Sequence, residues 1–147
     1  RKPNIITSLE LRSEEMEIIN LRIQEKYKKI EESEVRFEEY MLDDAEYAIV
    51  AFGSAARIAK KSIEIARSQG IKVGLLRPIT LWPFPTKEVQ KLGEKMKGIL
   101  SLEINAGQMV EDIRLAVAGR VPVQHFGRLG GIIPDPDEVV DAIKRLF

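Results

Sequence analysis

Short apolar runs alternate with helical periodicity through most of the chain. Four apolar runs, typical of buried strands, are followed in turn by four stretches with helical spacing. The runs lie at residues 47–52, 73–76, 99–104 and 121–126, and the helices are expected at about 55–69, 86–97, from just after 108 to 118, and 136–146. This alternation predicts an α/β fold, a sheet with helices covering both faces.

The segment before residue 47 has a different pattern. Residues 35–41 alternate apolar and polar side chains, which predicts a half-buried strand at an edge of the sheet, antiparallel to its neighbour. Farther upstream, Ser13 precedes three glutamates, as at a capped helix start. A helix over about 14–32 would carry one apolar stripe, made of Met16, Ile19, Ile23, Tyr27 and Ile30. With fewer than three heptads, this stripe favours packing on a neighbouring domain or subunit over a coiled coil.

Local signals set the expected helix ends and the domain division. Ser54 and Thr86 are expected to cap their helices, Gly70 to end one, and Pro136 to start the last one behind Asp135. The core face of the helix over 55–69 is expected to include Ile58, Ser62, Ile65 and Ala66. Residues 1–34 are predicted to form a linker segment with an amphipathic helix, and residues 35–147 an α/β domain.

Composition narrows the function classes. The formal net charge is zero, which argues against general nucleic-acid binding. The balance hides a split, because residues 1–47 hold 8 Lys/Arg and 13 Asp/Glu, whereas residues 48–147 hold 15 and 10. The absence of cysteine excludes disulfides, thiolate catalysis and cysteine-ligated clusters, and a single histidine argues against a histidine-rich metal site. No apolar leader precedes the first helix, so a cytoplasmic location is expected, and the initial Arg1 suggests a fragment of a longer protein.

Candidate functional residues follow the predicted strands. Ligands and partners collect at the carboxyl ends of parallel strands, where four segments are expected to converge. The candidate contact or anion-binding residues are Ser54, Arg77, Asn105, Gln108, Arg128, Gly130 and Gly131. No catalytic residue and no metal site is predicted, because no nucleophile–base pair, acid–base pair or metal cluster can be assembled from this sequence.

Most of these candidates also have a purely structural interpretation. For Ser54 a helix cap is favoured over phosphate binding, since Gly53-Ser54 lacks the glycines of a dinucleotide loop. Arg77 binds an anion or pairs with a carboxylate, and Arg128 contacts a partner or pairs with Asp135 or Asp137. Asn105 and Gln108 either cap a helix or make contacts. His125 is expected to be packed within a strand rather than catalytic.

The segment 81–85 places two aromatic residues on a stiff proline-rich loop. Trp82 and Phe84 are difficult to bury together, and exposed apolar patches usually mark interfaces. We therefore interpret them as a docking loop in preference to a ligand-stacking site.

Several stretches, taken together, resemble a known family. They are residues 39–46, 52–54, 74–85, 103–110 and 127–131. In this order they resemble the α subunit of 2-oxoacid:ferredoxin oxidoreductases that act on 2-oxoglutarate or 2-oxoisovalerate. The resemblance covers about 35–147, and the charged helix before it is similar, less specifically, to the linker after the family's first domain.

The resemblance implies a three-layer α/β/α domain similar to the transketolase C-terminal domain, with a five-stranded mixed sheet and one antiparallel edge strand. The complete enzyme would convert a 2-oxoacid, CoA and oxidised ferredoxin to acyl-CoA, CO2 and reduced ferredoxin, using thiamine diphosphate, Mg and Fe–S clusters. This chain has neither the thiamine domains nor the cluster cysteines, so it is expected to hold no cofactor and to be inactive alone.

The expected role is docking and assembly with the remainder of the α subunit, the β, γ and δ subunits and, through the complex, ferredoxin. No nucleic-acid or membrane partner is expected. A secondary possibility is that Arg77 and Arg128 hold an anion such as a phosphate of CoA. Two alternatives from other classes are a flavodoxin-like electron carrier and a stand-alone nucleotide-binding or regulatory module.

Overall fold

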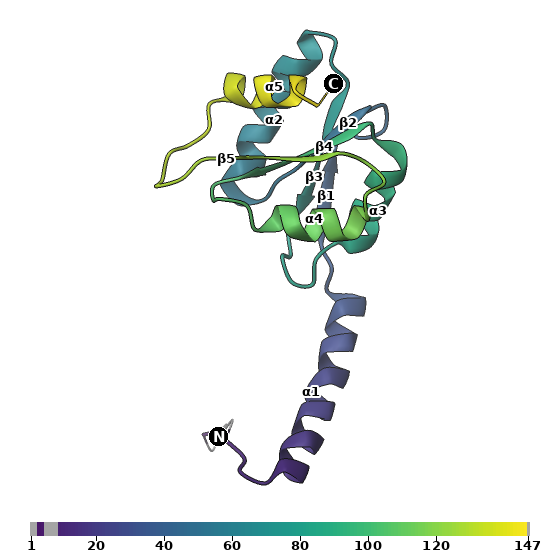
Figure 1. The fold of residues 1–147 in the computed structure, drawn as a ribbon, viewed down its shortest axis with the longest axis vertical. Helices are drawn as coiled ribbons and strands as arrows, with labels where there is room; N and C mark the ends of the chain where they lie inside the picture. Colours follow the sequence, from purple (N-terminus) through teal and green to yellow (C-terminus); the bar gives the residue numbers. More distant parts are fainter. Residues whose placement is uncertain (1–2, 5–8, 147) are drawn as a thin grey trace. The chain divides into compact units, whose positions relative to one another are not determined.

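The computed structural model describes residues 3–4 and 9–146. It divides the chain into two compact units, residues 1–34 and 35–147. The first unit contains helix α1 (Ser13–Ser33), and the second contains the sheet and four further helices (Figure 1). No helix among the described residues is both long enough and apolar enough to span a membrane.

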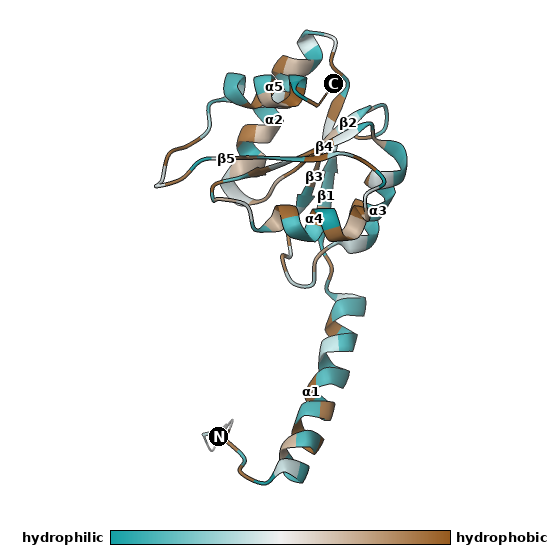
Figure 2. Cartoon of the chain, viewed as in Figure 1, coloured by the Kyte–Doolittle hydropathy of each residue, from teal (hydrophilic) through white to brown (hydrophobic). Residues whose placement is uncertain are grey.

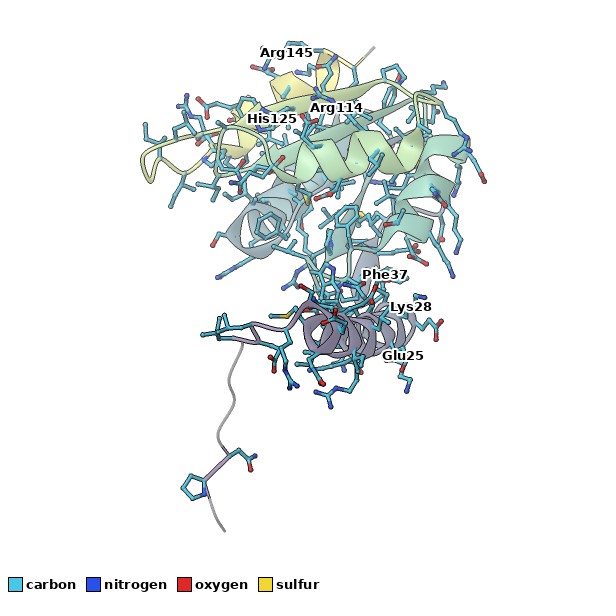
Figure 3. The ribbon with its side chains drawn as sticks, turned by 60° about the horizontal axis from the view of Figure 1, so that its bottom comes forward. Glu25, Lys28, Phe37, Arg114, His125 and Arg145 are labelled. Carbon is cyan, nitrogen blue, oxygen red and sulfur yellow. The ribbon has the colours of Figure 1, made fainter. Side chains whose placement is uncertain are left out.

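Helix α1 exposes most of its surface. None of its residues is buried, and in Figure 3 Glu25 and Lys28 project outward from it. The predicted cap at Ser13 is wrong, because Ser13 is the first helical residue and Arg12 is the N-cap, without a side-chain hydrogen bond. The carboxylate of Glu10 instead accepts the backbone N–H of Arg12, just before the helix.

The second unit is built on one mixed sheet. Its strand order is β1-β3-β2-β4-β5, with β1 antiparallel to β3 and every other pair parallel. The strands are β1 (Phe37–Tyr40), β2 (Tyr47–Val50), β3 (Val73–Pro78), β4 (Gly98–Glu103) and β5 (Val123–Gly127). The antiparallel edge strand confirms the prediction for residues 35–41.

Two helices cover each face of the sheet, which gives the three expected layers (Figure 1). Helices α2 (Gly53–Ser68) and α5 (Pro136–Lys144) pack together on one face. Helices α3 (Thr86–Lys95) and α4 (Met109–Val117) pack together on the other. Each face has its own apolar core, and Figure 2 shows apolar residues on the inner sides of these helices.

The buried face of α2 is rotated from the predicted one. Ser62 and Ala66 are buried as predicted, but Ile58 and Ile65 are only half-buried. The buried residues are Ala55, Ala56, Ala59, Ser62, Ile63 and Ala66. This face consists mainly of small side chains, which let the helix backbone come close to the sheet, together with the fully buried Ile63. Ile58 and Ile65 pack at its margin.

The helix ends predicted at Gly70 and Pro136 are confirmed, and the caps predicted at Thr86 and Ser54 are wrong. Gly70 has a φ of +83° and ends α2, donating to the carbonyl of Arg67, as in a Schellman motif. Helix α5 starts with Pro136 behind Asp135, whose carboxylate accepts the N–H of Asp137 within a capping box. Thr86, by contrast, does not cap α3, because Pro85 is the N-cap and the Thr86 hydroxyl donates back to Phe84 O at 3.4 Å.

Candidate functional site

The strand order places a crevice between the carboxyl ends of β2 and β4. The chain leaves β2 through α2 toward β3 on one side, and then crosses through α3 to β4 on the other side. Open α/β sheets bind ligands where the strand order reverses in this way. A pocket of about 140 Å³ lies there, which we call the switch-point pocket. It is lined by Phe52, Leu81, Phe84, Glu103, Asn105, Gln108, Met109 and Asp112.

Glu103, the last residue of β4, forms the floor of this site. Its side chain is fully buried, and Oε2 accepts the backbone N–H groups of Gln108 at 3.1 Å and Met109 at 2.9 Å. Oε1 accepts the N–H of Val110 at 3.0 Å and the Ser101 hydroxyl at 2.8 Å. The carboxylate therefore satisfies N–H groups at the start of α4 that no helical carbonyl can reach.

These hydrogen bonds also decide the charge of Glu103. Burial by itself would raise the pKa of this carboxyl, because the charged form loses its hydration. Hydrogen bonds from Gln108, Ser101, Met109 and Val110 outweigh burial and hold the pKa of Glu103 below its ordinary value. The site therefore keeps a buried negative charge at neutral pH.

The turn after Glu103 lies tightly against β5. Asn105 Oδ1 accepts the N–H of Gly107 at 2.7 Å, which closes the turn. A Cβ added to Gly127 would lie 2.3 Å from the Asn105 carbonyl oxygen, so only glycine fits there. His125, on β5, has Nε2 at 3.9 Å from Glu103 Oε1 and a side chain only 23% exposed (Figure 3). Its position within the strand and its low exposure fit the packed interpretation.

No side chain caps the start of α2 in the way that Glu103 caps the start of α4. Ser54 is exposed in the first turn and does not cap the helix, so the predicted cap is wrong. The N-cap is Phe52, without a side-chain hydrogen bond, and Gly53 turns the chain with a φ of +56°. The chain reverses here through the backbone freedom of glycine, and a hydroxyl cap is unnecessary.

The two candidate arginines are engaged in ion pairs and lie far apart. Arg77 pairs with Glu38 on β1 at 2.9 Å. Hydrogen bonds from Lys60 and Arg77 lower the pKa of the Glu38 carboxyl. Arg128 pairs with Glu138 at 3.0 Å rather than with either predicted aspartate. Strands β2 and β4 separate β3 from β5, so the two arginines leave the sheet about 14 Å apart. They do not converge on one anion.

The remaining candidates lie at the pocket or on open loops. Asn105 and Gln108 line the pocket, but neither amide caps α4. Gly130 and Gly131 have positive φ, and a Cβ on either would meet nothing within 4 Å. Trp82 is 54% exposed, whereas Phe84 is half-buried and lines the pocket.

The residue that organises the site is Glu103, whose carboxylate the sequence places with two amides at a strand end and helix start. It is not among the predicted contact residues. An acid at the end of an apolar run, followed within seven residues by a helix start, is the signal that could have identified it. The short distance along the chain indicates that such an acid lies close to the helix start. It does not show that the carboxylate accepts hydrogen bonds from the N–H groups there. Among the described residues, no group of three or more His, Cys, Asp or Glu could hold a metal ion.

The sheet order and its two helix layers form a three-layer fold that matches the transketolase C-terminal-like fold. The structure matches a 2-oxoglutarate:ferredoxin oxidoreductase from Magnetococcus marinus with a TM-score of 0.77, over 93% of this chain and 24% of that chain, at 20% identity. It also matches a split-gene transketolase with a TM-score of 0.63, over 74% of this chain and 41% of that chain, at 15% identity. The predicted fold class is confirmed.

Sequence comparison then identifies the family. Residues 45–139 match the pyruvate:ferredoxin oxidoreductase core domain II model, and the chain belongs to this family. It is 45% identical over 143 residues to ketoisovalerate oxidoreductase subunit VorB of Methanothermobacter thermautotrophicus, covering 97% of this chain and 40% of that subunit. It is 31% identical over 104 residues to 2-oxoglutarate synthase subunit KorA of Methanothermobacter marburgensis, covering 71% and 28%. The resemblance to 2-oxoacid:ferredoxin oxidoreductases is confirmed, and the chain spans less than half the length of these relatives.

Proposed function

We propose that this chain is a docking and assembly domain of the α subunit of a 2-oxoacid:ferredoxin oxidoreductase. The observation that carries the proposal is the exposed apolar loop beside the switch-point pocket, where Leu81 is 48% and Trp82 54% exposed. Large apolar side chains gathered at the functional edge of an α/β sheet are typical of a surface that a partner covers. Family membership supplies the partner class, since the relatives are oxidoreductase subunits.

In this proposal the complete enzyme converts a 2-oxoacid, CoA and oxidised ferredoxin to acyl-CoA, CO2 and reduced ferredoxin. The Fe–S clusters belong to other parts of the complex, since this chain has no cysteine to ligate a cluster. We assign thiamine diphosphate and Mg to those parts as well. Its partners are the remainder of the α subunit, the β, γ and δ subunits and, through them, ferredoxin. The chain alone is inactive, and the complex is cytoplasmic.

Direct contact with CoA is less well supported than docking. Both candidate arginines already pair with carboxylates, and the switch-point pocket is lined by Glu103 and Asp112 without a Lys or Arg. A phosphate would meet two negative charges in that pocket. The residues there do not fit an anionic group.

A chimera provides the test. The matched segment of the Methanothermobacter thermautotrophicus VorB subunit is replaced by this chain, and the hybrid is produced together with the other subunits of that enzyme. We expect a complex of native size that reduces a viologen dye when given ketoisovalerate and CoA. The proposal fails if the hybrid subunit is folded by circular dichroism but stays apart from the other subunits.

Two simple measurements test the alternatives. A flavodoxin-like carrier requires yellow preparations with bound FMN, and a nucleotide module requires that ATP or a related nucleotide raise the Tm of the isolated chain. We expect colourless protein and an unchanged Tm.

A further inference from the structure

The switch-point pocket has the size and walls of a receptor for one apolar side chain. Phe52, Leu81, Phe84 and Met109 provide apolar surface from β2, the loop before α3 and α4. The volume of about 140 Å³ is close to that of an apolar cavity that holds a benzene-sized group, ~150 Å³. The pocket is therefore too small to enclose a nucleotide or a coenzyme, and it is large enough for a leucine, methionine or phenylalanine side chain.

The apolar surface continues outside the pocket on a loop that is held in place. Ile79, Leu81 and Trp82 are 55%, 48% and 54% exposed. The N–H groups of Ile79 and Thr80 both donate to the carbonyl of Arg36, and the prolines on either side of Phe84 are buried. A partner that binds here meets a surface already ordered, which reduces the entropy lost on binding.

The charge around the pocket is negative. Glu103 is paired only with neutral donors and with His125 at 3.9 Å, and Asp112 is exposed on the first turn of α4. The neighbouring Glu111 pairs with Arg114 at 2.9 Å, but Asp112 has no ion-pair partner within the part of the chain that the structure describes. A Lys or Arg of a partner, placed next to the pocket, would supply the positive charge that Asp112 lacks as an ion-pair partner.

From these features we infer that the switch-point pocket and the loop of residues 79–82 bind a polypeptide segment that inserts one large apolar side chain and carries an adjacent Lys or Arg. The segment comes from the part of the oxidoreductase subunit that lies outside the matched region, because the chain spans only 40% of its VorB relative. The inference rests on the proposed function and adds the chemistry of the partner. It also predicts that acidic segments are rejected.

Assembly of the chimera with variant domains tests the inference. Leu81→Ser removes an apolar contact at the pocket, and Asp112→Lys reverses the charge beside it. Both residues are exposed, so neither substitution should disturb the fold. We expect each to weaken association with the rest of the complex at least about tenfold, as for a central interface residue. Matched controls are Met41→Asn, an exposed apolar residue at the opposite edge of the sheet, and Asp141→Lys on α5, both without effect.

A cysteine footprint gives an independent readout. This chain has no cysteine, so Gln108→Cys introduces a single thiol at the pocket and Met41→Cys a single thiol away from it. In the assembled chimera we expect maleimide to label Gln108→Cys at least about tenfold more slowly than in the free chain, by mass spectrometry, and Met41→Cys equally fast in both.

The outcomes separate this inference from the proposed function. If the chimera assembles but Leu81→Ser and Asp112→Lys assemble equally well, and Gln108→Cys stays reactive, the pocket is not the docking site while the proposed function stands. If the parent chimera is folded by circular dichroism but does not assemble, the proposed function itself fails. Stronger assembly with Asp112→Lys would overturn the expected basic partner.

Discussion

Helices α2 and α4 leave neighbouring parallel strands at the same edge of the sheet, yet they begin in different ways. Helix α4 starts on the buried carboxylate of Glu103, which accepts three of its N-terminal N–H groups and the Ser101 hydroxyl. Helix α2 starts at Phe52 and Gly53 without any capping side chain. The difference teaches that one start is fixed by a charged side chain and the other by backbone geometry, so the two should respond to substitution very differently.

The largest effect is expected at Glu103. Glu103→Ala leaves several buried N–H groups without an acceptor, and we expect it to lower the free energy of unfolding by about 3 kcal/mol. Urea denaturation of the whole chain, followed by circular dichroism, measures this. Glu103→Gln is the matched control, because it retains one acceptor oxygen and should recover part of the loss.

The same residue gives a pH dependence with a defined sign. The folded pKa of Glu103 lies below its ordinary value of 4.5, so ionised Glu103 stabilises the fold above that unfolded value. This contribution is lost as pH falls through the lowered folded pKa. The stability difference between wild type and Glu103→Gln should therefore be greatest near neutral pH and shrink in acid. A difference that grows on acidification would contradict a lowered pKa.

The tight contact between the β4–α4 turn and β5 gives the next largest effect. Gly127→Ala places a methyl group 2.3 Å from the Asn105 carbonyl oxygen and 2.6 Å from the His125 ring, so the turn must move. We expect a loss of about 2 kcal/mol from overpacking, by the same denaturation. Gly130→Ala is the control, since the added Cβ meets nothing within 4 Å. Only the positive φ opposes this substitution, so we expect it to lower the free energy of unfolding by about 1 kcal/mol.

At the start of α2 the effect should come from the backbone alone. Gly53 has a φ of +56° with open space around its Cβ position, so Gly53→Ala is expected to lower stability by about 1 kcal/mol. Gly53→Asn, which tolerates this conformation better, should lose less. Equal losses for Ala and Asn in thermal unfolding would show that space rather than φ is limiting.

The sequence predicted the sheet, its edge strand and the helix layers because buried strands and amphipathic helices have their own periodicities. It placed Asn105 and Gln108 after the end of a strand, and in the structure both line the switch-point pocket. The roles of Glu103, Ser54, Arg77 and Arg128 depended on side-chain direction and on partners distant in the chain. Glu38 and Arg77, for example, are 39 residues apart and meet only because β1 pairs with β3. The periodicity along one strand does not show which residues of another strand it pairs with.

The smallest effect, at Ser54, tests the comparison between the two helix starts most directly. If α2 begins through the geometry of Phe52 and Gly53, the exposed Ser54 hydroxyl adds nothing, and Ser54→Ala should change the free energy of unfolding by less than about 0.5 kcal/mol. A hydroxyl that caps a helix would instead be worth about 1 kcal/mol. The control is Asp135→Ala at the capping box of α5, where such a loss is expected. If Ser54→Ala matched Asp135→Ala in urea denaturation, Ser54 would cap α2 in solution, and the two helix starts at this edge would differ only in which side chain satisfies their N–H groups.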